Sequence, residues 1–433
     1  MTVDVDTDLD VAPETTRAAD RDESMHALLL RLAGSLPDRV LTDARDALAA
    51  GRRLDVVQAL AFEAVSQPLQ LDADEISAMR EELALGGGDL DLGLALEELR
   101  GDRPQAPWQF LSDLPTTQEE LASMVLPQDR SADPVDVLDP VDQALVAAAS
   151  AIPAVRAVWR AWRMPHTARP WQDPVRVAVV SVDDTTGGLP ALGVRLRRSM
   201  VEAGDAEAQV EVCWAGGAPF YQTLARSSGS LLWAARPAVP VATARLFDGV
   251  DPVRGPWFAS NRPVVSDPAR RDELLAALRG GVVVAWSSAA MADILSPDRG
   301  DVVPMHLRTD GTWLWSEAVG YYLENYGLAP DPELVGHLTG AERAEPLDEI
   351  SVHRALVHLC RPDAEAVLWP ASGADADPAS PAEPPSPAEP SSPTEPSSPD
   401  IPSSDGVPPA HPELPGVPPQ AGHDHATPRP VSP

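Results

Sequence analysis

The chain has 433 residues, 44% of them hydrophobic, which is enough to build two or three domains. It carries 66 acidic residues against 33 basic residues, a formal net charge of −33. An acidic surface repels phosphate backbones and anionic lipids, so the charge disfavours nucleic-acid and membrane binding and is compatible with a basic protein partner.

Missing residue types exclude several chemistries. All 33 basic residues are arginine, so the chain has no lysine for a Schiff base, a phosphate-binding loop or a kinase site. Its two cysteines, Cys213 and Cys360, are too few and too far apart for a disulfide framework or a cysteine zinc site, and we expect buried free thiols. No cofactor is expected. The acidic N-terminus lacks signal-peptide features and the longest apolar run is short, which together predict a cytoplasmic protein.

The first hundred residues predict an acidic arm followed by a helical domain. Residues 1–22 have no hydrophobic period and are expected to be disordered. Residues 23–100 contain four apolar stripes at helical spacing, with Asp72 as an expected N-cap and Gly51 as an expected C-cap. Four such amphipathic helices can close on one core.

Residues 101–139 are rich in proline, aspartate and glutamine and are expected to form a linker with one short helix near 116–126. The next stretch, 140–163, favours a helix interrupted at Pro153. Its second half combines tryptophans with arginines, namely Trp159 and Trp162 with Arg156, Arg160 and Arg163. We interpret this as an amphipathic helix that packs on the following domain, and an anion-binding face is the alternative.

Residues 140–362 are expected to form an α/β domain with a leading helix. The apolar run 175–182 predicts a buried strand, a helical stripe follows, and 208–214 predicts a second strand, so this order favours a parallel βαβ unit. Later apolar segments predict further strands around a helix at 267–280. The fold class is therefore α+β or mixed, with a small helical domain followed by a mixed β-sheet packed with helices.

The segment "RTDGTWLWSEAVGYYLENYG", residues 308–327, contains three of the four tyrosines. Asp310-Gly311 predicts a hairpin turn, Ser316 an N-cap, and Gly327 the end of the helix 317–326. Most of these aromatic side chains have a role in the core. The candidates for a partner-binding surface are Trp313, Trp315, Tyr321 and Tyr326.

This segment resembles one shared by uncharacterised proteins of GC-rich bacteria. The matching motifs are R-T-D-G-T-W-x-W, A-V-x-Y-Y-L and G-L-A-P-D-P-E-L, within residues 308–338. No activity is attached to that group, so the resemblance implies a recurring structural unit and no catalytic residue.

Two places carry candidate ligand chemistry. Asp183 and Asp184 follow the strand 175–182, where parallel sheets bind ligands, and could hold Mg²⁺ or act as acid and base. The alternative is structural, with Asp184 or Thr185 capping the next helix. Arg226 and Ser228, in what we expect to be a loop, could contact an anion.

Residues 371–433 are expected to be a disordered tail. Four hexapeptides in 380–403 repeat Ser-Pro with an acidic residue, which favours extended polyproline II structure. The tail could be a spacer, a ligand for an SH3-like groove, or a phosphorylated segment.

The sequence contains no convincing catalytic constellation or metal-ligand motif. We therefore expect a non-enzymatic protein that binds another protein, as an adaptor or as an immunity partner of a basic toxin. One alternative is a Mg²⁺-dependent or phosphoryl-ligand-binding enzyme that uses Asp183 and Asp184. Another is nucleic-acid binding through an arginine-rich face that adds Arg195, Arg197 and Arg198 to the three arginines of 140–163. Oligomeric state is not predicted.

Overall fold

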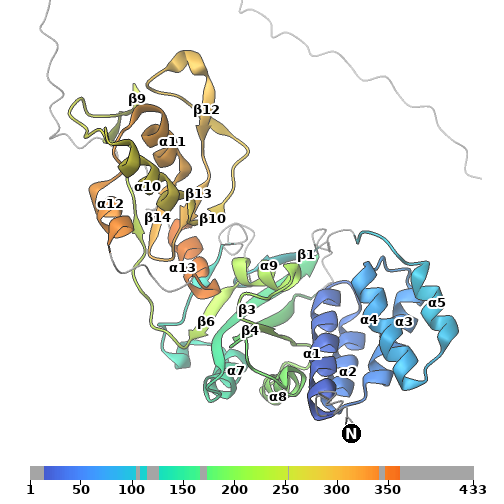
Figure 1. Cartoon of the computed structure of the whole chain (residues 1–433). Coiled ribbons are helices and arrows are strands. Elements are labelled where there is room, and N and C mark those ends of the chain that lie inside the picture. The colour runs from blue at the N-terminus through green and yellow to red at the C-terminus, as the bar shows by residue number, and fades with distance from the viewer. Residues whose placement is uncertain are drawn as a thin grey trace, which may run out of the picture. The chain divides into compact units, whose positions relative to one another are not determined.

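The computed structural model has an α+β fold with mixed sheets (Figure 1). It describes residues 14–103, 108–114, 126–165, 173–251, 253–340 and 347–360. The helices are α1 (Glu14–Leu32), α2 (Asp38–Ala49), α3 (Arg53–Ser66), α4 (Ala73–Gly86), α5 (Leu90–Glu97), α7 (Pro140–Ser150), α8 (Leu189–Glu202), α9 (Phe220–Ser228), α10 (Pro268–Arg279), α11 (Glu317–Tyr326), α12 (Pro332–Thr339) and α13 (Glu349–Leu359), with short 3₁₀ turns at Val135–Val137 and Pro297–Arg299.

The strands fall into two larger sheets and two hairpins. The first sheet contains β1 (Trp108–Leu111), β2 (Gln128–Asp129), β3 (Val155–Pro165), β4 (Val175–Val182), β5 (Gln209–Trp214) and β6 (Ser230–Ala234). The second contains β7 (Ala242–Thr243), β10 (Val282–Ala285), β13 (Leu307–Thr309) and β14 (Trp313–Ser316), and the two hairpins pair β8 (Gly249–Asp251) with β9 (Gly255–Trp257) and β11 (Ala290–Ala292) with β12 (Asp301–Pro304).

The N-terminal region is helical from an earlier residue than predicted. Helix α1 begins at Glu14, so the expectation that residues 1–22 are disordered is wrong for 14–22, and residues 1–13 lie outside the described part. The polar start of α1 is held by ion pairs: Arg21 contacts Glu82, and Asp22 lies 2.6 Å from Arg53. These partners are distant in sequence, which is why a hydrophobic period could not reveal this part of the helix.

The N-cap predicted at Asp72 is confirmed, whereas Gly51, predicted as a C-cap, follows the C-cap residue Ala50. The Asp72 side chain accepts a hydrogen bond from the Glu75 backbone N–H at 2.7 Å, and the Glu75 carboxylate accepts one from the Asp72 backbone N–H, so the two residues form a capping box. Gly51 follows α2 with φ of 73°, a left-handed conformation that favours glycine.

The segment predicted as linker and helix supplies strands of the first sheet. Helix α7 ends at Ser150, and the residues from Val155 onward form β3, so the prediction of a helix through residue 163 is wrong. Strands β1 and β2 lie within 101–139 and pair with β3 and β6. The short helix expected near 116–126 falls almost wholly outside the described residues.

The parallel βαβ unit is confirmed. Strands β4 and β5 pair in parallel, with Val177 opposite Gln209 and Val182 opposite Trp214, and α8 connects them. The strand order is β2-β6-β3-β4-β5, with β1 also paired to β3, and β3 runs antiparallel to β1, β4 and β6. Helix α9 and strand β6 were missed from the sequence, where this stretch was expected to be a loop.

Alternate residues of β4 face two different cores. Ala178, Val180 and Val182 belong to a cluster shared with α7 and α8. Val177 and Val179 belong to a second cluster, which includes side chains of α1 to α4, α9 and α13. The sheet therefore carries helices on both faces, and the buried side chains of the N-terminal helices are continuous with those of the sheet.

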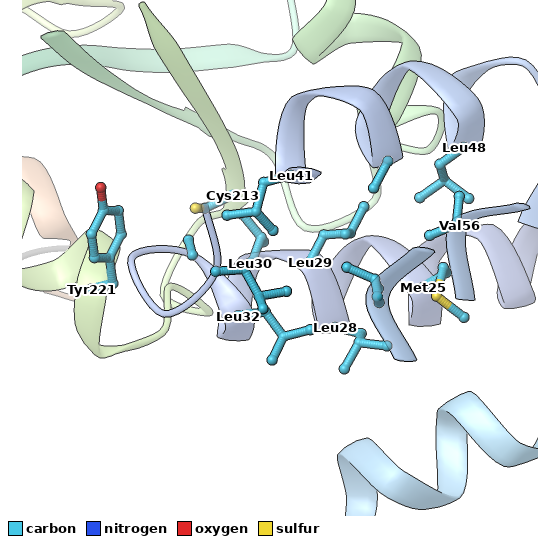
Figure 2. Packing of buried hydrophobic residues seen from close by; sticks show 14 of the residues in the cluster. Met25, Leu28, Leu29, Leu30, Leu32, Leu41, Leu48, Val56, Cys213 and Tyr221 are labelled. Atoms are coloured by element: carbon cyan, nitrogen blue, oxygen red, sulfur yellow. The ribbon is translucent and has the colours of Figure 1, made fainter. Parts of the chain in front are cut away.

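Figure 2 shows this second cluster at close range. In this view the leucines of α1 lie between Cys213 of β5 and Tyr221 of α9 at one end and Val56 and Leu48 at the other, where Met25 also lies. Cys213 is a fully buried free thiol, as expected, whereas Cys360 is half-buried. Burial raises the pKa of Cys213 to about 12, so this thiol stays protonated and unreactive.

The hairpin and helix predicted at 308–327 are confirmed. Strands β13 and β14 pair antiparallel around Gly311, whose φ is 95°. Ser316 caps α11 by accepting a hydrogen bond from the Ala318 backbone N–H at 3.2 Å, and Gly327 ends the helix with φ of 69°.

Within the described part of the chain, no helix is long and apolar enough to cross a membrane. The proline-rich tail expected at 371–433 lies outside the described residues.

Candidate functional site

The two candidate metal-binding carboxylates lie on an exposed loop. Asp183 and Asp184 follow β4, and both side chains are exposed. The residue that caps α8 is Gly188, with φ of 72° and no side-chain hydrogen bond, so the expectation that Asp184 or Thr185 caps this helix is wrong. Among the described residues, no group of three or more His, Cys, Asp or Glu side chains is placed to hold a metal ion. The two carboxylates are therefore not gathered with other acidic or histidine ligands.

One residue near the carboxyl end of β4, beside the usual ligand position of a parallel sheet, is hydrogen-bonded to α13. The Ser181 hydroxyl at the end of β4 donates a hydrogen bond to the Glu349 carboxylate in the first turn of α13. The adjacent Asp348 caps the helix and lies 3.2 Å from Arg156. Ile350 is 2% exposed and joins the core of this sheet face.

Helix α13 is further fixed through a buried histidine. His353 Nδ1 lies 3.1 Å from the Arg226 carbonyl oxygen and Nε2 lies 2.9 Å from the Gln128 carbonyl oxygen. Burial lowers the pKa of His353, although both carbonyls oppose this, so the ring is neutral at pH 7. A neutral imidazole donates through one nitrogen only, so His353 donates a hydrogen bond to one of these two carbonyl oxygens.

The predicted anion-binding pair lies in a helix. Arg226 and Ser228 belong to the last turn of α9, so the loop expected there is wrong. The Arg226 guanidinium lies over the Trp159 ring, 5.5 Å from its centroid, which is a cation–π contact. One nitrogen of this guanidinium, Nη1, is buried with no hydrogen-bond partner among the described residues. The structure gives no contact between Arg226 and the Ser228 side chain.

The arginines proposed for nucleic-acid binding do not share an exposed surface. Arg160 is 2% exposed and lies 3.3 Å from Asp142, and Arg163 is 6% exposed and lies 2.9 Å from Asp38. Two of the six guanidinium groups are thus buried against carboxylates and cannot contact phosphates.

The aromatic segment places its candidate interface residues partly inside the protein. Trp315 is 1% exposed, and Trp313 is half-buried beside the ring of His337. The hydroxyls of Tyr321 and Tyr326 both donate hydrogen bonds to the buried carboxylate of Asp293, Tyr321 at 2.8 Å. These contacts are internal, so the bulk of the segment is explained by packing.

A groove of about 860 Å³ lies between α4 and α5, and sequence reasoning did not identify it. Its walls include the small residues Ala84 and Gly93 and the side chain of Leu94. Leu94 is 63% exposed although it lies in the middle of a leucine-rich helix. A leucine at this spacing is ordinarily assigned to the core, and only the packing of α5 on α3 and α4 shows that it points outward.

Charged side chains line the same groove. Four carboxylates, those of Asp74, Glu81, Asp89 and Glu97, face two guanidinium groups, those of Arg80 and Arg100. Glu97 pairs with both arginines, at 2.6 Å from Arg100. The groove therefore has a net negative charge.

Comparisons with protein-family models, with curated proteins and with solved structures find no match to this chain.

Proposed function

We propose that this chain is a non-enzymatic protein that acts by binding another protein. The observation that supports this most directly is the apolar surface of the N-terminal helices. Three helices that pack on one another leave large apolar side chains open to solvent: Phe62 on α3 is 67% exposed, Leu85 on α4 is 59% exposed, and Leu94 on α5 is 63% exposed. Apolar side chains left exposed on neighbouring elements are characteristic of protein-binding surfaces.

The charge supports the same proposal. A protein with 66 acidic and 33 basic residues attracts basic partners over long range and repels nucleic acids. An adaptor or a neutralising partner of a basic protein fits this charge. The hydrogen bonds and ion pairs of Asp293, His353 and Arg160 are internal, so these groups support folding and not substrate chemistry.

The test is affinity capture of the full chain from lysate of its native cell. We expect a partner at stoichiometric amount that is lost when Phe62, Leu85 and Leu94 are replaced together by serine. Val253, which is 93% exposed elsewhere on the chain, provides the matched control, and Val253→Ser should retain the partner. Recovery of no stoichiometric partner would count against the proposal.

A further inference from the structure

We infer that the groove between α4 and α5 binds a basic amphipathic helix of the partner protein. This inference rests on the proposed protein-binding function and names the site and the chemical class of partner. The groove has the depth, the apolar anchor and the charge that such a helix requires.

The depth of the groove comes from small residues. Gly93 lies where α5 approaches α4, and a Cβ at this position would already lie 3.7 Å from Arg80 Cγ. Ala73 and Ala84 line the α4 side. These small residues line the groove together with longer side chains such as Arg80 and Glu81, and the side-chain ridge of a third helix can enter the groove.

The length of the groove limits how many apolar residues of a bound helix can contact it. Helix α5 has eight residues, which corresponds to about 12 Å along its axis. About two turns of a bound helix fit this length, so two or three apolar residues spaced at i, i+3 or i+4 and i+7 would contact the groove. Leu94 is the apolar side chain placed to meet them, because it lines the groove and is 63% exposed.

The charge of the groove selects a basic polar face. Arg80 and Arg100 both pair with Glu97. The carboxylates of Asp74, Glu81 and Asp89 also line the groove and are not paired with either arginine. Arginine or lysine beside the apolar stripe of the partner helix would pair with these carboxylates, whereas an acidic helix would be repelled.

The inference can be tested by selecting displayed helical peptides of about 18 residues, long enough for five turns, on the full chain. The library contains amphipathic helices with either basic or acidic polar faces. We expect basic peptides to be enriched, with an affinity that falls as salt rises because exposed charges are screened. The substitutions Glu81→Arg and Leu94→Asp should each lower the affinity of the chain for the selected synthetic peptide at least tenfold. Glu202→Arg makes the same charge change at an exposed position of α8 and should leave the affinity unchanged.

Three results would overturn the inference: no enrichment of basic peptides, peptides that bind Glu81→Arg as tightly as the original chain, or self-association that Glu81→Arg abolishes, which would place a second copy of the chain in the groove. The groove as binding site and the proposed protein-binding function can be rejected independently of each other. If affinity capture recovers a partner that Glu81→Arg and Leu94→Asp still bind, the groove is wrong and protein binding stands. If capture recovers no stoichiometric partner, the proposed function itself fails.

Discussion

Arg45 on α2 and Glu211 on β5 form a buried ion pair that joins the N-terminal helices to the first sheet. One guanidinium nitrogen of Arg45 lies 2.7 and 2.8 Å from the two carboxylate oxygens of Glu211. Glu211 is 2% exposed and also accepts a hydrogen bond from Gln222 at 3.0 Å. Both partners are thus removed from water and depend on each other for charge compensation.

Removal of one partner should therefore be costly. We expect Glu211→Ala to lower the free energy of unfolding by about 3 kcal/mol, because Arg45 is left buried without its counter-ion. The exposed pair Arg52–Asp55, at 2.8 Å, is the control, and Asp55→Ala should change stability by less than about 1 kcal/mol. Urea denaturation measures both values. Equal effects of the two substitutions would show that the buried pair does not stabilise the interface between helices and sheet.

The stability of the protein should depend on pH through His26. This side chain is 3% exposed, and its Nε2 lies 2.8 Å from the Val212 carbonyl oxygen. Burial lowers the pKa of His26 to about 4 in the folded chain, against an ordinary value of 6.5. The folded state thus resists protonation while the unfolded state accepts a proton, so stability is complete above pH 6.5 and falls between pH 6.5 and 4, by about 3 kcal/mol.

The measurement for His26 is the slope of unfolding free energy against pH. His26→Leu loses the hydrogen bond to Val212 and is less stable at pH 7, but its slope between pH 6.5 and 4 should be shallower than that of the original chain. A slope unchanged by the substitution would mean that other groups cause the acid dependence.

The hydrogen bonds around Asp293 should contribute to stability in a pH-dependent way. Burial raises the pKa of Asp293, but hydrogen bonds from Tyr326 and Tyr321 and from the backbone N–H of Leu295 outweigh it, so the net pKa lies below the ordinary range. Tyr326→Phe should cost about 2 kcal/mol at pH 7, because a buried carboxylate loses a donor. This contribution is present above pH 3.8 and disappears as pH falls through the lowered pKa. Asp298→Asn, an exposed change in the same loop, should be neutral, and a Tyr326→Phe effect that does not shrink as pH falls below 3.8 would contradict the ionic role of Asp293.

Local signals explain which parts of the fold the sequence predicted. The hairpin at Asp310-Gly311, the N-cap Ser316 and the C-terminal Gly327 each act on neighbouring residues, so spacing alone identified them. The βαβ unit was predicted because its strand and helix periods differ clearly.

Long-range pairing explains what the sequence could not predict. In β3, tryptophan and arginine recur every three or four residues, which is typical of an amphipathic helix. The segment is a central strand in which Arg160 and Arg163 pair with the carboxylates of Asp142 on the preceding helix α7 and Asp38 on the distant helix α2. The same limit applies to the groove, since no local pattern reveals that Leu94 is exposed between two helices. Spacing likewise did not show that Asp183 lies on an exposed loop or that Arg226 lies over the Trp159 ring.

Two glycines should respond to alanine in opposite directions. A Cβ on Gly281 would overlap the ring of Trp315, which is 1% exposed and held in the core, and would lie 3.0 Å from the Thr309 carbonyl oxygen. Because neither the ring nor the strand can move without disturbing the packing, Gly281→Ala should lower the free energy of unfolding by about 2 kcal/mol.

Gly336 lies inside α12 and a Cβ there meets nothing within 4 Å, so Gly336→Ala should raise the free energy of unfolding by up to about 1 kcal/mol through helix propensity. Thermal or urea unfolding distinguishes the two signs. A stabilising Gly281→Ala would show that Trp315 has room to shift, and it would remove the steric reason for glycine where α10 passes into β10.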